Sequence, residues 1–408
     1  MRILRTFILL WLALEAPAET AGHPLFERIE EVTQKLSEIT GLAVKRPVPY
    51  AMIDRKELKE FLERRIREEV KPEDIRIEET LLKKFGLAPV DFDLKKTTIE
   101  LYIEQAAAFY DFQRKKLFIL ESADRALQEA ALAHELAHAL ADQHFRLRKF
   151  LDRAGKNDDG ALARMAVMEG QASWLMAELM VRGVGQSLEN SSEMVEIMSR
   201  MIGAAGGESP VYDSAPLYIR ESLIFPYTAG MKFQQAVIQR MGKKGFLEVF
   251  RRPPASTQQV LHPEKYFEGT AAERVELPDL WTRREYRTLA EGNVGEFDYA
   301  VLIRQYVDEE ATRRIAPGWR GASYRLLEHK RDKRTVLAQA SRWETAETAQ
   351  RFLEAYREAL KGKWNRMEVT GESAERIAGR GDDGFFLLRR DGPHVYSLEG
   401  LAAAEEAR

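Results

Sequence analysis

The sequence contains no cysteine among its 408 residues. Disulfide bonds and thiolate metal ligands are therefore excluded, and so is a lipid attached to an N-terminal cysteine. The absence does not identify the compartment, because an exported protein can also do without cysteine. Histidine is scarce as well, with 7 residues in the whole chain. Two histidines close together in such a sequence are for that reason informative.

The sequence also lacks an excess of either charge. The formal net charge is −3 at pH 7, which favours neither nucleic-acid binding nor a polybasic attachment to membranes. No apolar run approaches the roughly 20 residues that a membrane-spanning helix needs. A hydrophobic content of 45% and a charged content of 31% are typical of soluble domains with sizeable cores. The length predicts two or three domains.

The first 18 residues are typical of a secretory signal peptide. Arg2 and Arg5 supply the positive start, residues 7–14 form a short apolar core, and residues 16–18 (Ala-Pro-Ala) are a typical cleavage site. We therefore expect an exported protein, periplasmic or secreted, with no membrane span after the signal is removed. An uncleaved N-terminal anchor is the less favoured alternative.

Residues 130–141 are apolar except for His134, Glu135 and His138, which follow the spacing His-Glu-x-x-His. On a helix, residues four apart lie on one face, so the two imidazoles can share a metal ion and the glutamate can reach a water beside it. The alternative is two surface histidines on an amphipathic helix beside a solvated glutamate. The apolar flanks disfavour that alternative, since a buried unpaired glutamate is costly.

A second apolar helix is predicted over residues 161–180, and Glu169 lies in its middle among alanine, methionine and valine. A glutamate in such a place is either the partner of an arginine or a metal ligand. Together with His134 and His138 it would give three N/O ligands and one open position, the pattern of catalytic zinc. Zn²⁺ is therefore the predicted cofactor, and Glu135 the predicted general base.

Acyl transfer at zinc also needs a hydrogen-bond donor for the developing oxyanion. Tyr227 is one candidate, because it lies at Pro226, between two predicted helices. His262 and Tyr266 are the others, since they lie near the end of a short helix that begins at Ser256. For each of the three, the alternative is a buried residue that is hydrogen-bonded for packing.

The segment 134–138, followed by Glu-Gly-x-Ala at 169–172, resembles the gluzincin type of zinc metallopeptidase. Residues 134–144 also resemble a group of secreted bacterial proteins that are mostly uncharacterised, and residues 225–230 and 256–266 share that resemblance. The resemblance implies a zincin-like core, a zinc ion held by the two histidines and the later glutamate, and a peptide or protein substrate.

The resemblance covers roughly residues 42–340, and one position departs from it. Thermolysin-like members have an aspartate four residues after the ligand glutamate, where it braces a ligand histidine, but this chain has Ser173 there. Asp142, one turn beyond His138, is the candidate to brace a ligand here. Residues 108–120 are predicted to form a hairpin, which either pairs with an extended substrate or is purely structural.

The predicted fold is α+β and mainly helical. After the signal peptide at 1–18, we expect an N-terminal helical segment at 19–95, a zincin-like metallopeptidase core at 96–314 and a small C-terminal α+β domain at 315–408. The last is predicted from two hairpins and one amphipathic helix in that region.

Two further functions stay open beside an exported zinc peptidase. The first is a non-catalytic exported protein that binds zinc and a partner on the same scaffold. The second is a metal hydrolase that cleaves a non-peptide amide, such as a cell-wall crosslink. The sequence makes no prediction of the oligomeric state.

Overall fold

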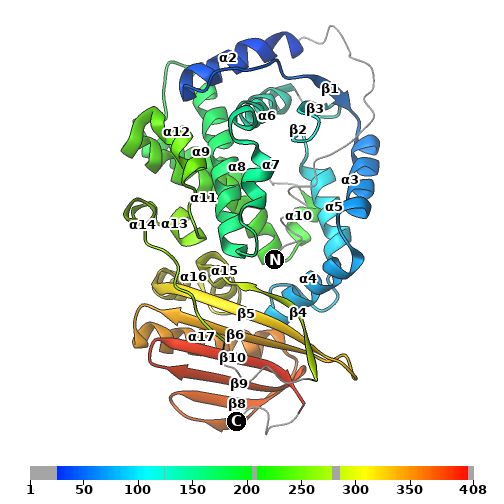
Figure 1. The fold of residues 1–408 in the computed structure, drawn as a ribbon, viewed down its shortest axis with the longest axis vertical. Coiled ribbons are helices and arrows are strands. Elements are labelled where there is room, and N and C mark those ends of the chain that lie inside the picture. Colours follow the sequence, from blue (N-terminus) through cyan, green and yellow to red (C-terminus); the bar gives the residue numbers. More distant parts are fainter. Residues whose placement is uncertain (1–24, 124, 205–208, 278–284, 403–408) are drawn as a thin grey trace.

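The computed structural model describes residues 25–123, 125–204, 209–277 and 285–402. The predicted signal peptide lies outside these residues. The described chain has a mainly helical part with a small sheet, followed by a C-terminal antiparallel sheet (Figure 1). The predicted α+β, mainly helical fold is confirmed. None of the described helices combines the length and the apolar character that a bilayer crossing requires.

Local sequence signals begin and end the N-terminal helices. Asp54 accepts a hydrogen bond from the Glu57 amide, and the Glu57 carboxylate accepts one from the Asp54 amide, so a capping box begins one helix. Gly41, with a φ of 75°, ends another in the left-handed conformation. The helices of this segment are α2 (Ile29–Thr40), α3 (Arg55–Glu69), α4 (Pro72–Phe85) and α5 (Leu94–Gln105).

A three-stranded sheet joins one strand of this segment to two strands that precede the central helices. Its order is β1 (Tyr50–Ile53), β3 (Lys116–Leu120) and β2 (Ala108–Asp111), and β2 is therefore an edge strand. Strands β2 and β3 form the predicted hairpin. Their side chains alternate between faces, so that Phe109 and Phe118 stack on one face while Tyr110 joins the main core.

Three long helices form the centre of the molecule, namely α6 (Arg125–Phe145), α8 (Asp158–Arg182) and α11 (Leu217–Met241). Helix α8 packs between the other two. Gly170 on α8 meets Gly230 on α11 so closely that a Cβ atom on Gly170 would lie 2.1 Å from the Gly230 carbonyl carbon. This close approach places Glu169, the neighbour of Gly170, beside α11.

Helix α11 continues through Pro226, so the prediction of two helices separated at this residue is wrong. A proline inside a helix costs about 3 kcal/mol, because it removes one backbone hydrogen bond and crowds the preceding turn. The buried side chains on both sides of Pro226, which pack in the core, offset that cost. The shorter helices around this centre are α7 (Leu147–Asp152), α9 (Ser192–Ala204), α10 (Pro210–Ser214), α12 (Gly245–Arg251), α13 (Thr257–Leu261) and α14 (Pro263–Glu268).

The C-terminal part is a seven-stranded sheet in which every neighbouring pair is antiparallel. The two predicted hairpins and the amphipathic helix are all present, and β4, which precedes residue 315, also belongs to the sheet. Helices α15 (Glu296–Tyr306) and α16 (Glu309–Ile315) lie between the two parts (Figure 1). The other elements are β4 (Tyr286–Asn293), β5 (Trp319–His329), β6 (Thr335–Trp343), α17 (Ala346–Lys363), β7 (Met367–Glu372), β8 (Arg376–Gly381), β9 (Gly384–Asp391) and β10 (His394–Leu401).

Candidate metal centre

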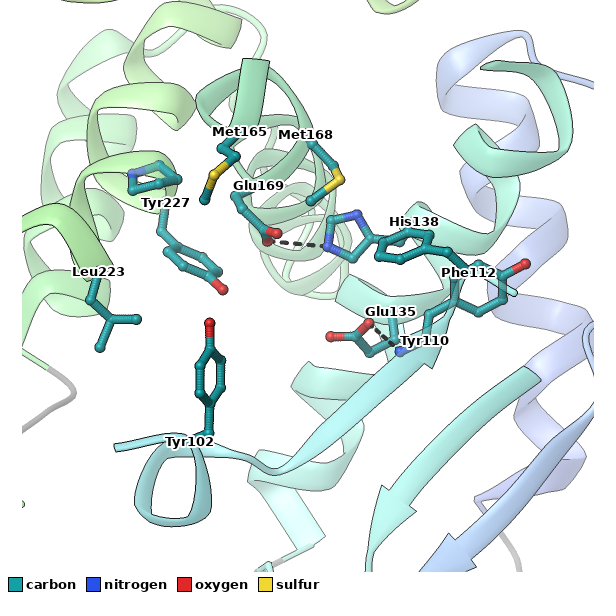
Figure 2. A pocket seen from close by; sticks show the side chains of 11 residues that line it. Tyr102, Tyr110, Phe112, Glu135, His138, Met165, Met168, Glu169, Leu223 and Tyr227 are labelled. Atoms are coloured by element: carbon teal, nitrogen blue, oxygen red, sulfur yellow. Dashed lines mark hydrogen bonds and ion pairs between the residues drawn. The ribbon is translucent and has the colours of Figure 1, made fainter. Parts of the chain in front are cut away.

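The packing of α6 on α8 brings the three predicted metal ligands together. The Nε2 atoms of His134 and His138 lie 3.0 Å apart, and each lies 3.1 Å from Oε2 of Glu169. All three side chains are buried. Figure 2 shows the Glu169 carboxylate facing the His138 ring. Residues that are 31 and 35 positions apart in the sequence thus form one cluster able to hold a metal ion.

The spacing of the three atoms fits a metal ion. Ligands at about 2.0–2.1 Å from a tetrahedral Zn²⁺ lie about 3.3 Å from one another. The observed separations of 3.0 and 3.1 Å need to open by only a few tenths of an ångström. Two imidazoles and one carboxylate are also a donor set of catalytic zinc sites, which keep one position open. In the described part of the chain, no other group of three histidine, aspartate or glutamate side chains converges in this way.

The Glu169 carboxylate is held in its ionised form. Burial alone would raise its pKa, but the charges and hydrogen bonds of His138 and His134 outweigh burial, and the pKa falls to about 2. Glu169 therefore pairs with the two histidines, and not with an arginine, which was the alternative in the sequence analysis. A negative charge fixed between two imidazoles is suited to binding a cation.

Glu135 lies beside the three predicted ligands and also reaches the edge strand β2. Its Oε2 atom accepts a 2.8 Å hydrogen bond from the Tyr110 backbone amide. Burial, aided by the nearby Glu169 charge, raises the pKa of Glu135 to about 8, although His134 and the Tyr110 amide oppose the shift. A carboxyl group with a pKa in this range can both take up and release a proton near neutral pH.

Two tyrosines complete the wall opposite Glu135. The Tyr227 ring stacks on the His134 ring, with 5.8 Å between centroids and 25° between planes. Figure 2 shows the hydroxyl groups of Tyr227 and Tyr102 pointing towards each other. The Tyr102 hydroxyl is buried and has no hydrogen-bond partner among the described residues. Burial and the nearby Glu169 charge raise the pKa of both phenols far above 10, so both remain donors.

The side-chain hydrogen bonds of Asp142 come from the hairpin and from the Leu147 amide, and not from His134 or His138. Its Oδ2 atom accepts from Lys115 Nζ at 2.6 Å and from the Tyr110 hydroxyl at 3.2 Å. Its Oδ1 atom accepts from the Leu147 amide at 2.9 Å. In the described part of the chain, neither Asp142 oxygen accepts a hydrogen bond from a histidine. Asp142 therefore reaches the site indirectly, through the strand whose Tyr110 amide binds Glu135.

The structure does not bring the other two oxyanion candidates to the ligands. His262 lies at the junction of α13 and α14, where its Nε2 atom is 2.7 Å from Oε1 of Glu296. The Tyr266 hydroxyl donates to the Arg252 carbonyl oxygen at 2.8 Å. Neither residue lines the cavities beside the histidines. Of the three sequence candidates, Tyr227 is the one at the site, and Tyr102 is a residue that the sequence analysis missed.

A small cavity of about 40 Å³ lies against Glu135, His138 and Glu169. One water molecule needs about 10–15 Å³ measured in this way, so the cavity has room for solvent beside the ligands. The cavity shares Tyr102, Glu135 and Tyr227 with a larger one of about 360 Å³. Room for water and room for a larger group thus lie beside the candidate ligands.

Comparison with known families matches residues 284–408 to a domain of unknown function (DUF8575). The match covers the C-terminal sheet with α15 to α17, and it does not reach α6 or α8. The comparisons with curated proteins and with solved structures found no match. The assignment of a His-His-Glu metal centre therefore rests on the geometry of His134, His138 and Glu169.

Proposed function

We propose that the protein is an exported zinc-dependent peptidase. The observation that supports this proposal is the convergence of His134, His138 and Glu169 beside Glu135, in contact with a cavity that admits water. A structural zinc site has four protein ligands, whereas a catalytic one keeps a position for water or substrate. The typical signal peptide at residues 1–18 supports export.

The three ligands would hold the ion, and Glu135 would act as the general base. Zn²⁺ in this place would supply a Lewis acid and lower the pKa of water to about 7. Glu135 takes the proton from the attacking water and passes it to the amine that leaves. The Tyr110 amide fixes one carboxylate oxygen of Glu135, which leaves the other for the water.

The hydroxyl groups of Tyr227 and Tyr102 would stabilise the oxyanion that forms on the substrate carbonyl. Both stay protonated, because burial and Glu169 raise the pKa of each phenol. The Tyr102 hydroxyl has no partner among the described residues, so it is available for a substrate oxygen. Donors already fixed in a buried site stabilise developing charge without reorganisation.

The edge strand β2 offers a way to align a peptide. Its partner in the sheet is β3, and the Tyr110 amide on its other side points towards Glu135. An extended peptide could add to this outer edge as a further strand, with its backbone beside the proton acceptor. We propose a peptide or protein substrate for this reason.

The test is a digest of unfolded protein with and without a metal chelator. We expect chelation to abolish cleavage and stoichiometric Zn²⁺ to restore it, with the metal content measured in the same samples. A His138→Ala variant serves as the control that loses a ligand. Cleavage that persists in the metal-free protein would contradict the proposal. Zinc binding without any cleavage would favour a non-catalytic zinc-binding protein instead.

A further inference from the structure

A large apolar cavity borders the candidate metal centre. It has a volume of about 360 Å³, and it includes His134, Glu135 and Tyr227 in its wall. The rest of the wall comes from residues on α5, α6, α8, α9, α10 and α11, and from residues 106–108 at the start of β2. A group attached to a substrate at the metal centre would therefore enter this cavity directly.

The chemistry of the wall favours an uncharged occupant. Leucine, isoleucine, alanine and methionine side chains make up most of it, including Leu101, Met176 and Ile219. Among the described residues, Glu135 is its only acidic side chain, and no lysine or arginine lines it. An anionic substrate group would lose its hydration here without a lysine or arginine partner, whereas an apolar group gains by leaving water.

The cavity is too large to be filled by a single small side chain of a substrate. A cavity of about 150 Å³ is enough to hold benzene. The cavity here is more than twice that size, at about 360 Å³. One phenyl ring would leave much of the apolar wall in contact with water and not with substrate, so a larger apolar group gains more by binding here.

We propose that the substrate carries, next to the cleaved bond, an apolar group larger than one phenyl ring, and that this cavity selects for it. Two groups have this chemistry, namely a pair of neighbouring large apolar side chains and a fatty acyl chain on the peptide. The inference rests on the proposed peptidase function, because it places the scissile bond at the metal centre.

Two substitutions change the cavity wall without replacing any of the proposed metal ligands. Ala131, one turn before His134 on α6, lines the wall, so Ala131→Phe fills part of the space. Leu127 lines the cavity while its residue is 49% exposed, so Leu127→Lys adds a charge at a position that tolerates solvent. Ala126→Phe is the matched control, because Ala126 is exposed on the same helix and does not line this cavity.

Binding is measured by fluorescence anisotropy in a zinc-loaded Glu135→Gln background, so that no probe is cleaved. The probes are three short labelled peptides that are identical except for a central Phe-Leu pair, a central Ala-Ala pair, or Ala-Ala with an N-octanoyl group. We expect the Phe-Leu or the octanoyl peptide to bind about ten- to a hundredfold more tightly than the plain Ala-Ala peptide. Which of the two binds tighter identifies the source of the apolar group.

Ala131→Phe and Leu127→Lys should both remove most of this preference, and Ala126→Phe should keep it. Equal affinity for all three probes, or a preference that survives both cavity variants, would overturn the inference. Hydrolysis by the wild-type protein is measured in parallel. A binding preference without hydrolysis would refute the peptidase function but keep the proposed role of the cavity. Hydrolysis without a binding preference would refute the role of the cavity but keep the peptidase function.

Discussion

The backbone amide of Tyr110 donates a 2.8 Å hydrogen bond to Oε2 of Glu135. Tyr110 belongs to β2, so the strand that would align a peptide also orients the carboxylate that would take the proton. The Tyr110 hydroxyl in turn donates to Asp142, which also pairs with Lys115. Asp142 thus contacts the hairpin whose Tyr110 amide binds Glu135, the proposed general base.

Asp142→Asn tests this arrangement. The hairpin would lose the charged Lys115 contact, so we expect kcat to fall by about tenfold while zinc affinity stays within about threefold of wild type. An aspartate that braced a ligand histidine would behave differently, because removing such a partner typically costs about 10–100-fold in metal affinity or activity. Zinc affinity measured by competition with a chromophoric chelator separates the two roles.

Tyr227→Phe and Tyr102→Phe should each lower kcat by roughly 10²–10³-fold, the usual effect of removing one oxyanion donor. We expect zinc content to be unchanged and KM to change little. Tyr102→Phe should not lower the melting temperature, since it deletes a buried hydroxyl that has no partner among the described residues. Steady-state kinetics with calorimetry checks both points, and a kcat close to wild type in both variants would refute the donor role.

Gly230→Ala should destabilise the protein by about 1–3 kcal/mol, because overpacking forces the surroundings to move. A Cβ atom there would lie 2.1 Å from the Ala166 carbonyl oxygen on α8. Gly203→Ala is the matched control, since its Cβ would meet only Thr228 at an ordinary 3.7 Å. Chemical denaturation measures both free energies of unfolding. Equal stability of the two variants would contradict the close helix packing that places Glu169.

The stability of the protein should fall as the pH rises between about 4 and 7 because of Asp159. Burial is the main cause that raises the pKa of this carboxyl from 3.8 to about 7. In that window the unfolded chain releases the proton while the folded chain keeps it, which costs roughly 1.4 kcal/mol per pH unit. Above pH 7 both states are ionised and the slope ends.

Asp159→Asn removes this titration and keeps the oxygen that accepts from the Thr257 amide. We expect wild type to lose on the order of 3 kcal/mol relative to the variant between pH 5 and pH 8. Urea denaturation at the two pH values gives the difference directly. A constant difference between the two proteins would show that Asp159 is ionised in the folded state throughout.

The cluster of candidate metal ligands could be predicted because its signal is local. Two histidines one helical turn apart, and a lone glutamate on another apolar helix, are recognisable without knowing how the helices pack. Tyr102 carries no such signal. It lies on α5, far from the motif in sequence, and it meets the site only because α5, α6 and α11 line the same cavity in the folded chain.

The less successful predictions extended local geometry to tertiary contacts. His262 does lie at a helix end, as predicted, but Glu296 of a distant helix pairs with it there. Asp142 does lie one turn beyond His138, but its oxygens meet donors from the hairpin and from the Leu147 amide. Pro226 usually ends a helix, and here tertiary packing overrides that tendency. Each outcome depended on tertiary packing that local sequence does not encode.

The most direct test of the account compares zinc content and peptide hydrolysis in wild type and in Glu135→Gln. Glutamine keeps the shape of the side chain and leaves the three ligands in place, but it cannot accept the proton. We predict that both proteins bind one zinc ion per chain and that the variant hydrolyses no labelled casein. Full hydrolysis by the variant, or no zinc in either protein, would contradict the assignment.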